Sequence, residues 1–175
     1  MDEAYAQWDM EQNHGMTAQA PVDHPYLEDI ERERIRWEEL ARLCATFPVD
    51  ARDRHGYYAD PGREWSMKDM LAHVGTWLAQ GKSRLERIRA GTYDHEDLDI
   101  DSMNDTFLAA IHDQPWSVVW TQANSARTLL LAAWYELEVR TADADWWLRK
   151  VGPDHYEEHL GRLREWSAEV RASGA

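Results

Sequence analysis

Apolar residues recur every three or four positions along most of the chain, which is the spacing of one face of an α-helix. This pattern predicts five helices, over residues 25–47, 66–91, 99–112, 116–140 and 153–171. Pro48 and Pro115 follow the first and third of them, where proline stops a helix. No stretch of useful length alternates apolar and polar residues as a strand does. The chain is therefore predicted to be all-α, with four or five helices packed as a bundle.

The second predicted helix carries clear signals at both ends. Ser66 precedes Asp69 by three residues, close to the capping-box pattern that begins many helices. Gly91 stands where a glycine commonly ends one. Between these ends, Met70 and Val74 belong to an apolar stripe that also contains Trp77, His73, Leu78, Leu85 and Ile88.

The segments between the predicted helices are rich in polar residues, glycine and proline. Residues 48–65 are predicted to form a loop, in which Tyr57 and Tyr58 could fold over a site. Residues 141–153 are predicted to form a polar linker with a short helical turn around Trp146. Residues 1–24 contain few aliphatic side chains and are predicted to be an N-terminal extension, poorly ordered or peripheral, to a bundle domain over residues 25–175.

Charge and composition narrow the classes of function. The chain has 175 residues, enough for one domain, and a net charge of −14, which argues against general binding to nucleic acid. Cys44 is the single cysteine, so no internal disulfide can form, and a reducing, cytoplasmic location is the simpler interpretation. The N-terminus lacks the pattern of a secretory signal, and no apolar stretch is long enough to cross a membrane.

Tryptophan is abundant, at ten residues against two phenylalanines. Trp supplies a large apolar surface with one polar atom, so it suits both a core and the wall of a cavity. Trp37 and Trp166 follow helical spacing with aliphatic residues and are predicted to lie in the core. The adjacent pair Trp146 and Trp147 is predicted to form an aromatic lid or a dimer contact.

Three histidines are predicted to face the interior. His155 and His159 stand four residues apart and continue the apolar stripe of Leu163, Trp166 and Val170. His73 lies on the stripe of the second helix, where Asp69, one turn earlier, could accept a hydrogen bond from its ring. Such a set is either a divalent-metal site or a group of hydrogen-bonded core histidines, and the residues alone leave both alternatives open.

Two segments resemble a known superfamily. The segment WSMKDMLAHVGTW (65–77) resembles the second-helix signature of the DinB-like superfamily, and DHYEEHLGRLREW (154–166) is similar to its closing helix. The closest resemblance is to the DfsB/ClbS-like branch, which also tends to carry an asparagine where this chain has Asn104. The resemblance extends over roughly residues 26–170, with the two quoted segments as its specific part.

The resemblance implies a four-helix bundle in up-down-down-up order, a possible homodimer, and a divalent metal, zinc or nickel, held by His73, His155 and His159. It implies an enzyme of hydrolase type that acts on a small molecule, in detoxification or in self-resistance to a reactive, DNA-damaging compound. The alternatives are a thiol-dependent transferase or isomerase, which would need inward cations such as Arg127, and a non-catalytic protein that sequesters a hydrophobic natural product.

If the metal is bound, three protein ligands leave a coordination position open for chemistry. Asp69 would then orient a ligand from outside, and Asn104 would hold water or substrate through its amide. The remaining predicted contacts are substrate-binding residues of the pocket wall: Tyr57, Tyr58, Trp77 and Trp120.

Overall fold

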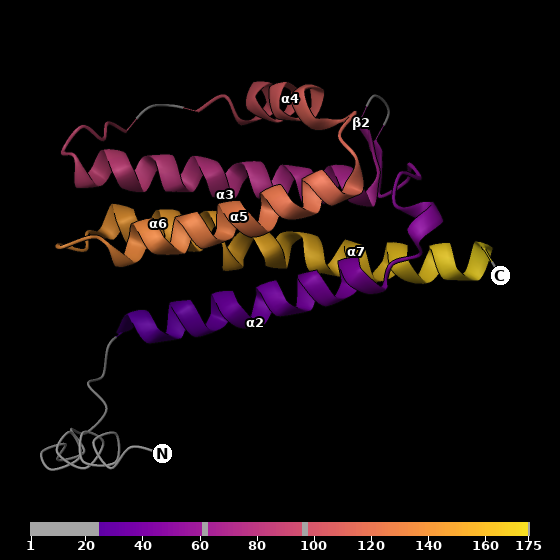
Figure 1. The fold of residues 1–175 in the computed structure, drawn as a ribbon, viewed down its shortest axis with the longest axis horizontal. Helices are drawn as coiled ribbons and strands as arrows, with labels where there is room; N and C mark the ends of the chain where they lie inside the picture. The colour runs from indigo at the N-terminus through magenta and orange to yellow at the C-terminus, as the bar shows by residue number, and fades with distance from the viewer. Residues whose placement is uncertain (1–24, 61–62, 96–97, 175) are drawn as a thin grey trace, which may run out of the picture.

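The computed structural model describes residues 25–60, 63–95 and 98–174, and it confirms the all-α fold. Four long helices form the bundle: α2 (Pro25–Thr46), α3 (Met67–Arg89), α5 (Trp116–Tyr135) and α7 (Pro153–Ser173). Helices α2 and α7 run in one direction, and α3 and α5 run in the other, which is the up-down-down-up order (Figure 1). The predicted extension over residues 1–24 lies outside the described residues.

Two further helices flank the bundle. The helix α4 (Ile100–Ile111) belongs to the crossover between α3 and α5 and packs on α3 (Figure 1). The helix α6 (Ala142–Val151) packs on α3 and α7. Residues 141–153 were predicted to be a linker with a single turn, and that prediction is wrong, because Thr141 caps a helix of ten residues by accepting a hydrogen bond from the backbone N–H of Ala144.

The fourth predicted helix is shorter than its pattern suggested. It was expected to reach Arg140, but α5 ends at Tyr135 and its apolar seam ends with Leu137 outside the helix. In the loop predicted over residues 48–65, the chain forms a short 3-10 turn (Val49–Ala51) and a small antiparallel hairpin of β1 (Tyr58–Asp60) and β2 (Arg63–Trp65). Each strand has three residues, too few to show an alternating pattern.

The predicted ends of α3 are confirmed by their hydrogen bonds. The side chain of Ser66 accepts from the backbone N–H of Asp69, and the Asp69 carboxylate accepts from the backbone N–H of Ser66. At the other end, Gly91 has a φ of +67°, and the N–H groups of Gly91 and Thr92 reach back to the carbonyls of Ile88 and Arg87. This closing pattern needs a residue that tolerates positive φ, and glycine does so without strain.

The core lies between the four long helices. Trp37 and Trp166 are buried in it, as predicted, at 5% and 7% exposure. Helix α3 packs most extensively on α5, and at Gly75 the two helices are so close that a Cβ atom would lie 3.0 Å from the Cα of Ala123. Fully buried aliphatic residues fill the centre: Leu40, Met70, Leu71, Leu78, Leu130 and Leu163.

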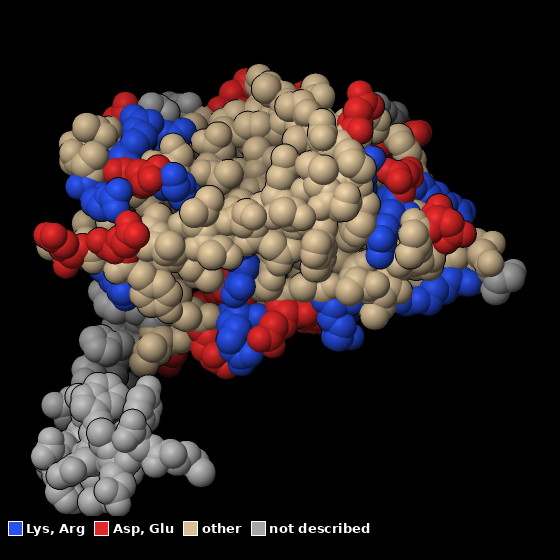
Figure 2. All heavy atoms as spheres, in the orientation of Figure 1, with Lys and Arg blue, Asp and Glu red and all other residues tan. Residues whose placement is uncertain are grey.

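Charge is unevenly spread over the surface. Ion pairs join the outer sides of α2 and α7, including Arg32 with Asp154 at 2.7 Å and Arg36 with Glu157 at 2.6 Å. In the face shown in Figure 2, charged side chains gather at the ends and along the edge formed by α2, whereas the middle of the face, over α5, is largely uncharged. Helix α5 contains one charged residue, Arg127, in its twenty.

Candidate metal centre

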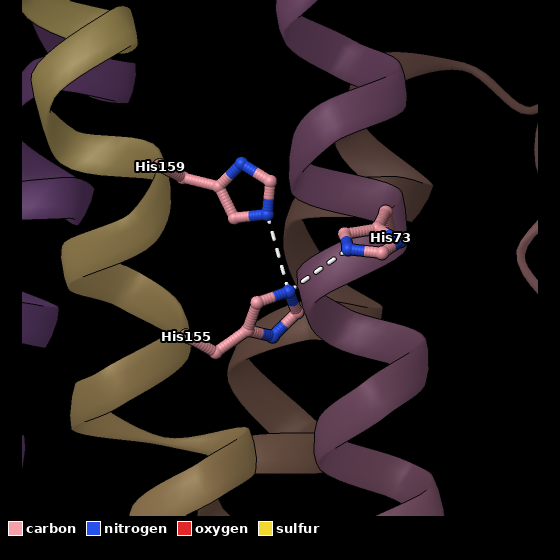
Figure 3. Close-up of side chains that lie close together, drawn as sticks. All are labelled: His73, His155 and His159. Atoms are coloured by element: carbon pink, nitrogen blue, oxygen red, sulfur yellow. Dashed lines mark hydrogen bonds between the residues drawn. The ribbon is translucent and has the colours of Figure 1, made fainter. Parts of the chain in front are cut away.

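Three buried histidines from two helices converge between α3 and α7 (Figure 3). His155 and His159 project from α7 one turn apart, and His73 projects toward them from α3. Their exposed fractions are between 5% and 8%, so all three are part of the interior. The prediction that these rings face inward is confirmed.

The rings meet through their Nε2 atoms. His155 Nε2 lies 2.8 Å from His73 Nε2 and 3.1 Å from His159 Nε2. A neutral imidazole nitrogen carries either one proton or one lone pair, so His155 Nε2 can form a good hydrogen bond with one of these neighbours but not with both. Two ligands of a tetrahedral zinc ion, each at about 2.0–2.1 Å, lie roughly 3.3 Å apart, which is close to the observed separations.

Burial keeps the three rings neutral. It lowers the pKa of His73 to about 3, with a further contribution from the neighbouring His159. Burial also lowers the pKa of His159 to about 4, against the opposing effect of Glu158, and holds the pKa of His155 well below its ordinary value. Neutral imidazole is the form that binds a metal, so the protein supplies three nitrogen lone pairs without a competing proton at neutral pH.

Tyr57 contacts His159 at two atoms, the Nδ1 of its ring and its backbone carbonyl oxygen. The Tyr57 hydroxyl donates to the carbonyl oxygen of His159 at 3.1 Å and lies 3.0 Å from His159 Nδ1. When the hydroxyl proton is directed to the carbonyl, Nδ1 donates its own proton to Tyr57 Oη, and the lone pair is then on Nε2. Burial raises the pKa of Tyr57, so its hydroxyl remains protonated. The contact therefore prepares His159 to bind an ion through Nε2.

The segment that carries the two tyrosines is anchored to the same helix as the histidines. Arg162 of α7 donates to the backbone carbonyls of Gly56 and Tyr57, at 2.9 and 2.6 Å. Tyr58 follows with its hydroxyl 3.3 Å from His159 Nδ1. Both tyrosines of this segment therefore contact the imidazole ring of His159.

Asp69 does not have the predicted contact with His73. Its Oδ2 accepts from Ser66 in the capping box, and its Oδ1 lies 3.2 Å from Nδ1 of His112, at the end of α4. His73 Nδ1 is buried without a hydrogen-bond partner among the described residues. The ring of His73 points Nε2 toward α7, so Nδ1 turns away and meets no carboxylate of its own helix.

A cavity of about 490 Å³ opens beside the histidines. It lies between the hairpin, α3, α4, α6 and α7, and all three histidines reach its wall. Its other lining residues are mostly apolar or aromatic: Tyr58, Trp65, Trp77, Leu98, Ile100, Trp146, Trp147 and Val151, with Asn104, Lys150 and Glu158 as the polar ones. The site therefore joins a set of metal-ligand atoms to a space of small-molecule size.

The predicted wall residues separate into two groups. Tyr58, Trp77 and Asn104 line the cavity, and Asn104 accepts a hydrogen bond from Trp77 Nε1 at 2.9 Å. Tyr57 is fully buried behind His159 and is not among the residues that line the cavity. Trp120 stacks on Trp116 and is not among the residues that line the cavity, because none of the described lining residues comes from α5.

Sequence reasoning missed several lining residues. The Trp65 ring contacts His73 in a tilted arrangement with ring centroids 4.8 Å apart, yet in the sequence it falls in what was predicted to be a plain loop. Trp146 and Trp147, predicted to form an aromatic lid or a dimer contact, both line the cavity. Trp147 is buried at 4% exposure and donates to the Tyr93 hydroxyl at 3.0 Å. The signal for Trp147 was the helical pattern of residues 142–151, with Asp143 and Asp145 in the first turn and Arg149 and Lys150 in the last.

The fold and the buried histidines together define a helical-bundle protein with a group that could hold a metal ion. No protein-family model matches the chain, and no curated protein matches its sequence. A crystal structure of an uncharacterised protein from Escherichia coli UTI89 is similar, with a TM-score of 0.70 and 14% sequence identity, over 83% of this chain and 94% of that one. At this identity the likeness supports the fold alone. None of the helices described here is long and apolar enough to span a membrane.

Proposed function

We propose that this protein is a divalent-metal-dependent enzyme of the DinB-like superfamily that adds water to an electrophilic small molecule. The observation that carries the proposal is the convergence of three neutral imidazole Nε2 atoms at the wall of an apolar cavity. A structural zinc site normally has four protein ligands, whereas a catalytic site has three and an open position. The described residues offer three ligand atoms here, within 4.8 Å of one another.

A divalent ion in this group supplies Lewis-acid activation of water at neutral pH. The residues of the chain hold and shape the site around that chemistry. The contact of the Tyr57 hydroxyl with Nδ1 of His159 favours a lone pair on Nε2, and the rings of Trp65 and Trp77 pack beside His73. Asn104 places a side-chain amide in the cavity that contains the three histidines.

The charges of the cavity favour water over a glutathione-like thiol as the second reactant. Such a thiol carries carboxylates, which call for arginine or lysine partners. Arg127, the cation considered from the sequence, forms a two-point ion pair with the buried Glu33, at 2.7 and 2.6 Å, and does not line the cavity. Apart from histidines, Lys150 is the one basic residue among the described lining residues, and it pairs with Glu158 at 2.8 Å.

A binding protein without catalysis would also use an aromatic cavity, but it would not need three histidine nitrogens to converge. Hydrogen bonding alone satisfies this group poorly, because His155 Nε2 has two close nitrogen neighbours and His73 Nδ1 has no partner among the described residues. A metal ion between the three Nε2 atoms would accept a lone pair from each of them. The resemblance to the DfsB/ClbS-like branch supports a reactive, DNA-damaging compound as the physiological substrate and self-resistance as the role.

A neutral aromatic ester tests the activity directly. We expect the zinc- or nickel-loaded protein to hydrolyse 4-nitrophenyl acetate with water to acetate and nitrophenol, and the activity to be lost on chelation and regained with metal. The His155→Ala variant, equally folded by circular dichroism, is the control for background reactivity of surface histidines. Turnover that is equal in this variant, or that requires added glutathione, would contradict the proposal.

A further inference from the structure

The walls of the cavity present flat carbon surfaces. Trp65, Trp77, Trp146 and Trp147 reach it from β2, α3 and α6. The indole N–H of Trp77 is taken by Asn104 and that of Trp147 by Tyr93, at 2.9 and 3.0 Å. Because these two N–H groups are already bonded within the protein, the rings have no donor left for a ligand and offer it their π faces. Such surfaces bind flat, apolar molecules.

The cavity offers no unpaired cation to an anionic ligand. Lys150 is the one lysine or arginine among the described lining residues, and its ammonium is neutralised by Glu158. The net charge of −14 on the chain also repels anions at longer range. In the metal-free protein, a carboxylate, sulfonate or phosphate would lose its hydration on entering and find no unpaired side-chain cation among the described lining residues, which is costly.

One polar group in this wall has a fixed orientation. Trp77 Nε1–H can only donate, so the atom of Asn104 that it contacts must be the carbonyl oxygen Oδ1. The amide of Asn104 is thereby held with its NH₂ on the other side. No hydrogen bond to this nitrogen is found among the described residues, and Asn104 lines the cavity. The pair Trp77–Asn104 therefore leaves the NH₂ group of Asn104 as a hydrogen-bond donor for a ligand.

We infer that the cavity selects a neutral, flat aromatic molecule that carries a carbonyl or a similar hydrogen-bond acceptor, which Asn104 Nδ2 binds. This inference deepens the proposed function by naming its substrate class. Binding itself rests on the tryptophans and Asn104, so it does not require a metal ion. The volume of about 490 Å³ accommodates a molecule of drug-like size.

Prodan, a neutral naphthalene ketone whose emission shifts to the blue in apolar surroundings, is a suitable probe. We expect it to bind the chelator-treated, full-length protein at one site per chain with a blue shift. Toluidinyl naphthalenesulfonate, a dye with a similar ring but a negative charge, should bind at least about tenfold more weakly, because its charge finds no partner. Dimethylaminonaphthalene, which lacks the ketone, should bind about fivefold more weakly than prodan, the effect of one neutral hydrogen bond.

Two variants test the role of the pair. Asn104→Leu removes the donor, and Trp77→Phe keeps an aromatic wall but frees the amide to turn. In both, we expect the roughly fivefold preference for the ketone over its ketone-free analogue to disappear while the analogue still binds. Trp120→Phe is the matched control, since Trp120 lies outside the cavity, and it should keep the preference.

Each outcome has a separate meaning. Equal affinity for the sulfonate, no binding of prodan, or an unchanged ketone preference in Asn104→Leu would each overturn the inference. Metal content is measured on the same samples. A protein that binds metal but shows no prodan selectivity refutes the substrate class and leaves the metal proposal standing, whereas selectivity without metal binding refutes the metal proposal alone.

Discussion

Tyr156 and His155 are neighbours on α7, but they belong to two different buried polar clusters. In one cluster the polar atoms are paired within the protein, and in the other they are not. Tyr156 donates to Glu33 at 3.2 Å, and the same carboxylate accepts two bonds from Arg127. Burial and the charge of Glu33 hold the pKa of Tyr156 well above its ordinary value, so its hydroxyl stays a donor. In this first cluster the charges are paired, and it joins α2 to α5 and α7.

The histidine cluster on the other side of α7 is open by comparison. Its three Nε2 atoms compete for one another, and His73 Nδ1 has no partner within the described residues. Glu33, Tyr156 and the three histidines are all buried, and Arg127 is partly exposed. Of the two clusters, only the histidines border the cavity of about 490 Å³. The hydrogen bonds within the Glu33 cluster account for its burial as part of the fold. The histidine cluster keeps lone pairs without a partner, which indicates a binding site for an external ligand.

The largest expected effect comes from breaking the closed cluster. Glu33→Gln leaves Arg127 without its counter-charge, and we expect the free energy of unfolding to fall by about 3–5 kcal/mol. Urea denaturation of the chelator-treated protein measures this. The double variant Glu33→Leu/Arg127→Met, which removes both charges, should recover part of the loss. A single variant within about 1 kcal/mol of the unmodified protein would show that the ion pair is not structural.

For the histidine cluster we expect a large loss of metal affinity and a smaller loss of stability. His155→Ala should weaken zinc affinity at least about 100-fold, which is about 2.7 kcal/mol, because one of three ligands is lost. Isothermal titration calorimetry gives the affinity. In metal-free protein the same change should cost less unfolding free energy than Glu33→Gln does. If the stability losses were equal and the zinc affinity unchanged, the contrast between the two clusters would be lost.

Acid should destabilise the metal-free protein through the histidines. The unfolded chain binds protons on these three rings with a pKa near 6.5, whereas the folded chain binds them only near 3 for His73, near 4 for His159 and well below 6.5 for His155. The unfolded state therefore takes up more protons as the pH falls, and stability falls with it. From about pH 7 to about pH 6 we expect a loss of about 2 kcal/mol.

The pH dependence has its own control. His155→Gln removes one of the three titrating rings, so about a third of the loss should disappear. Denaturant titrations at several pH values in the presence of chelator measure both proteins. A stability that is constant over this range would mean that the folded chain protonates the rings as readily as the unfolded chain does.

The smallest expected effect is on zinc affinity, when the hydroxyl group that contacts His159 is removed. Tyr57→Phe removes the hydroxyl that fixes His159, and we expect zinc affinity to fall about tenfold, the lower end of what such supporting contacts contribute. Trp120→Phe serves as a control of similar size outside the site. Unchanged zinc affinity in Tyr57→Phe would show that packing alone orients His159.

The sequence predicted those features that depend on local spacing. Ser66, Asp69 and Gly91 marked the ends of α3 because caps are set within a few residues. The three histidines were found because a spacing of three or four places residues on one helix face. It could not show that the Asp69 carboxylate turns to Ser66 and His112 instead of His73, since that choice depends on the ring orientation. The roles of Tyr57, Trp120 and Trp147 depended likewise on how the elements pack together.

A crystal structure of the zinc-loaded protein with anomalous scattering tests the central claim most directly. We predict a single strong anomalous peak at about 2.0–2.1 Å from the Nε2 atoms of His73, His155 and His159. No peak at this position in crystals that contain zinc, or a peak held by other residues while the three rings keep their contacts, would contradict it.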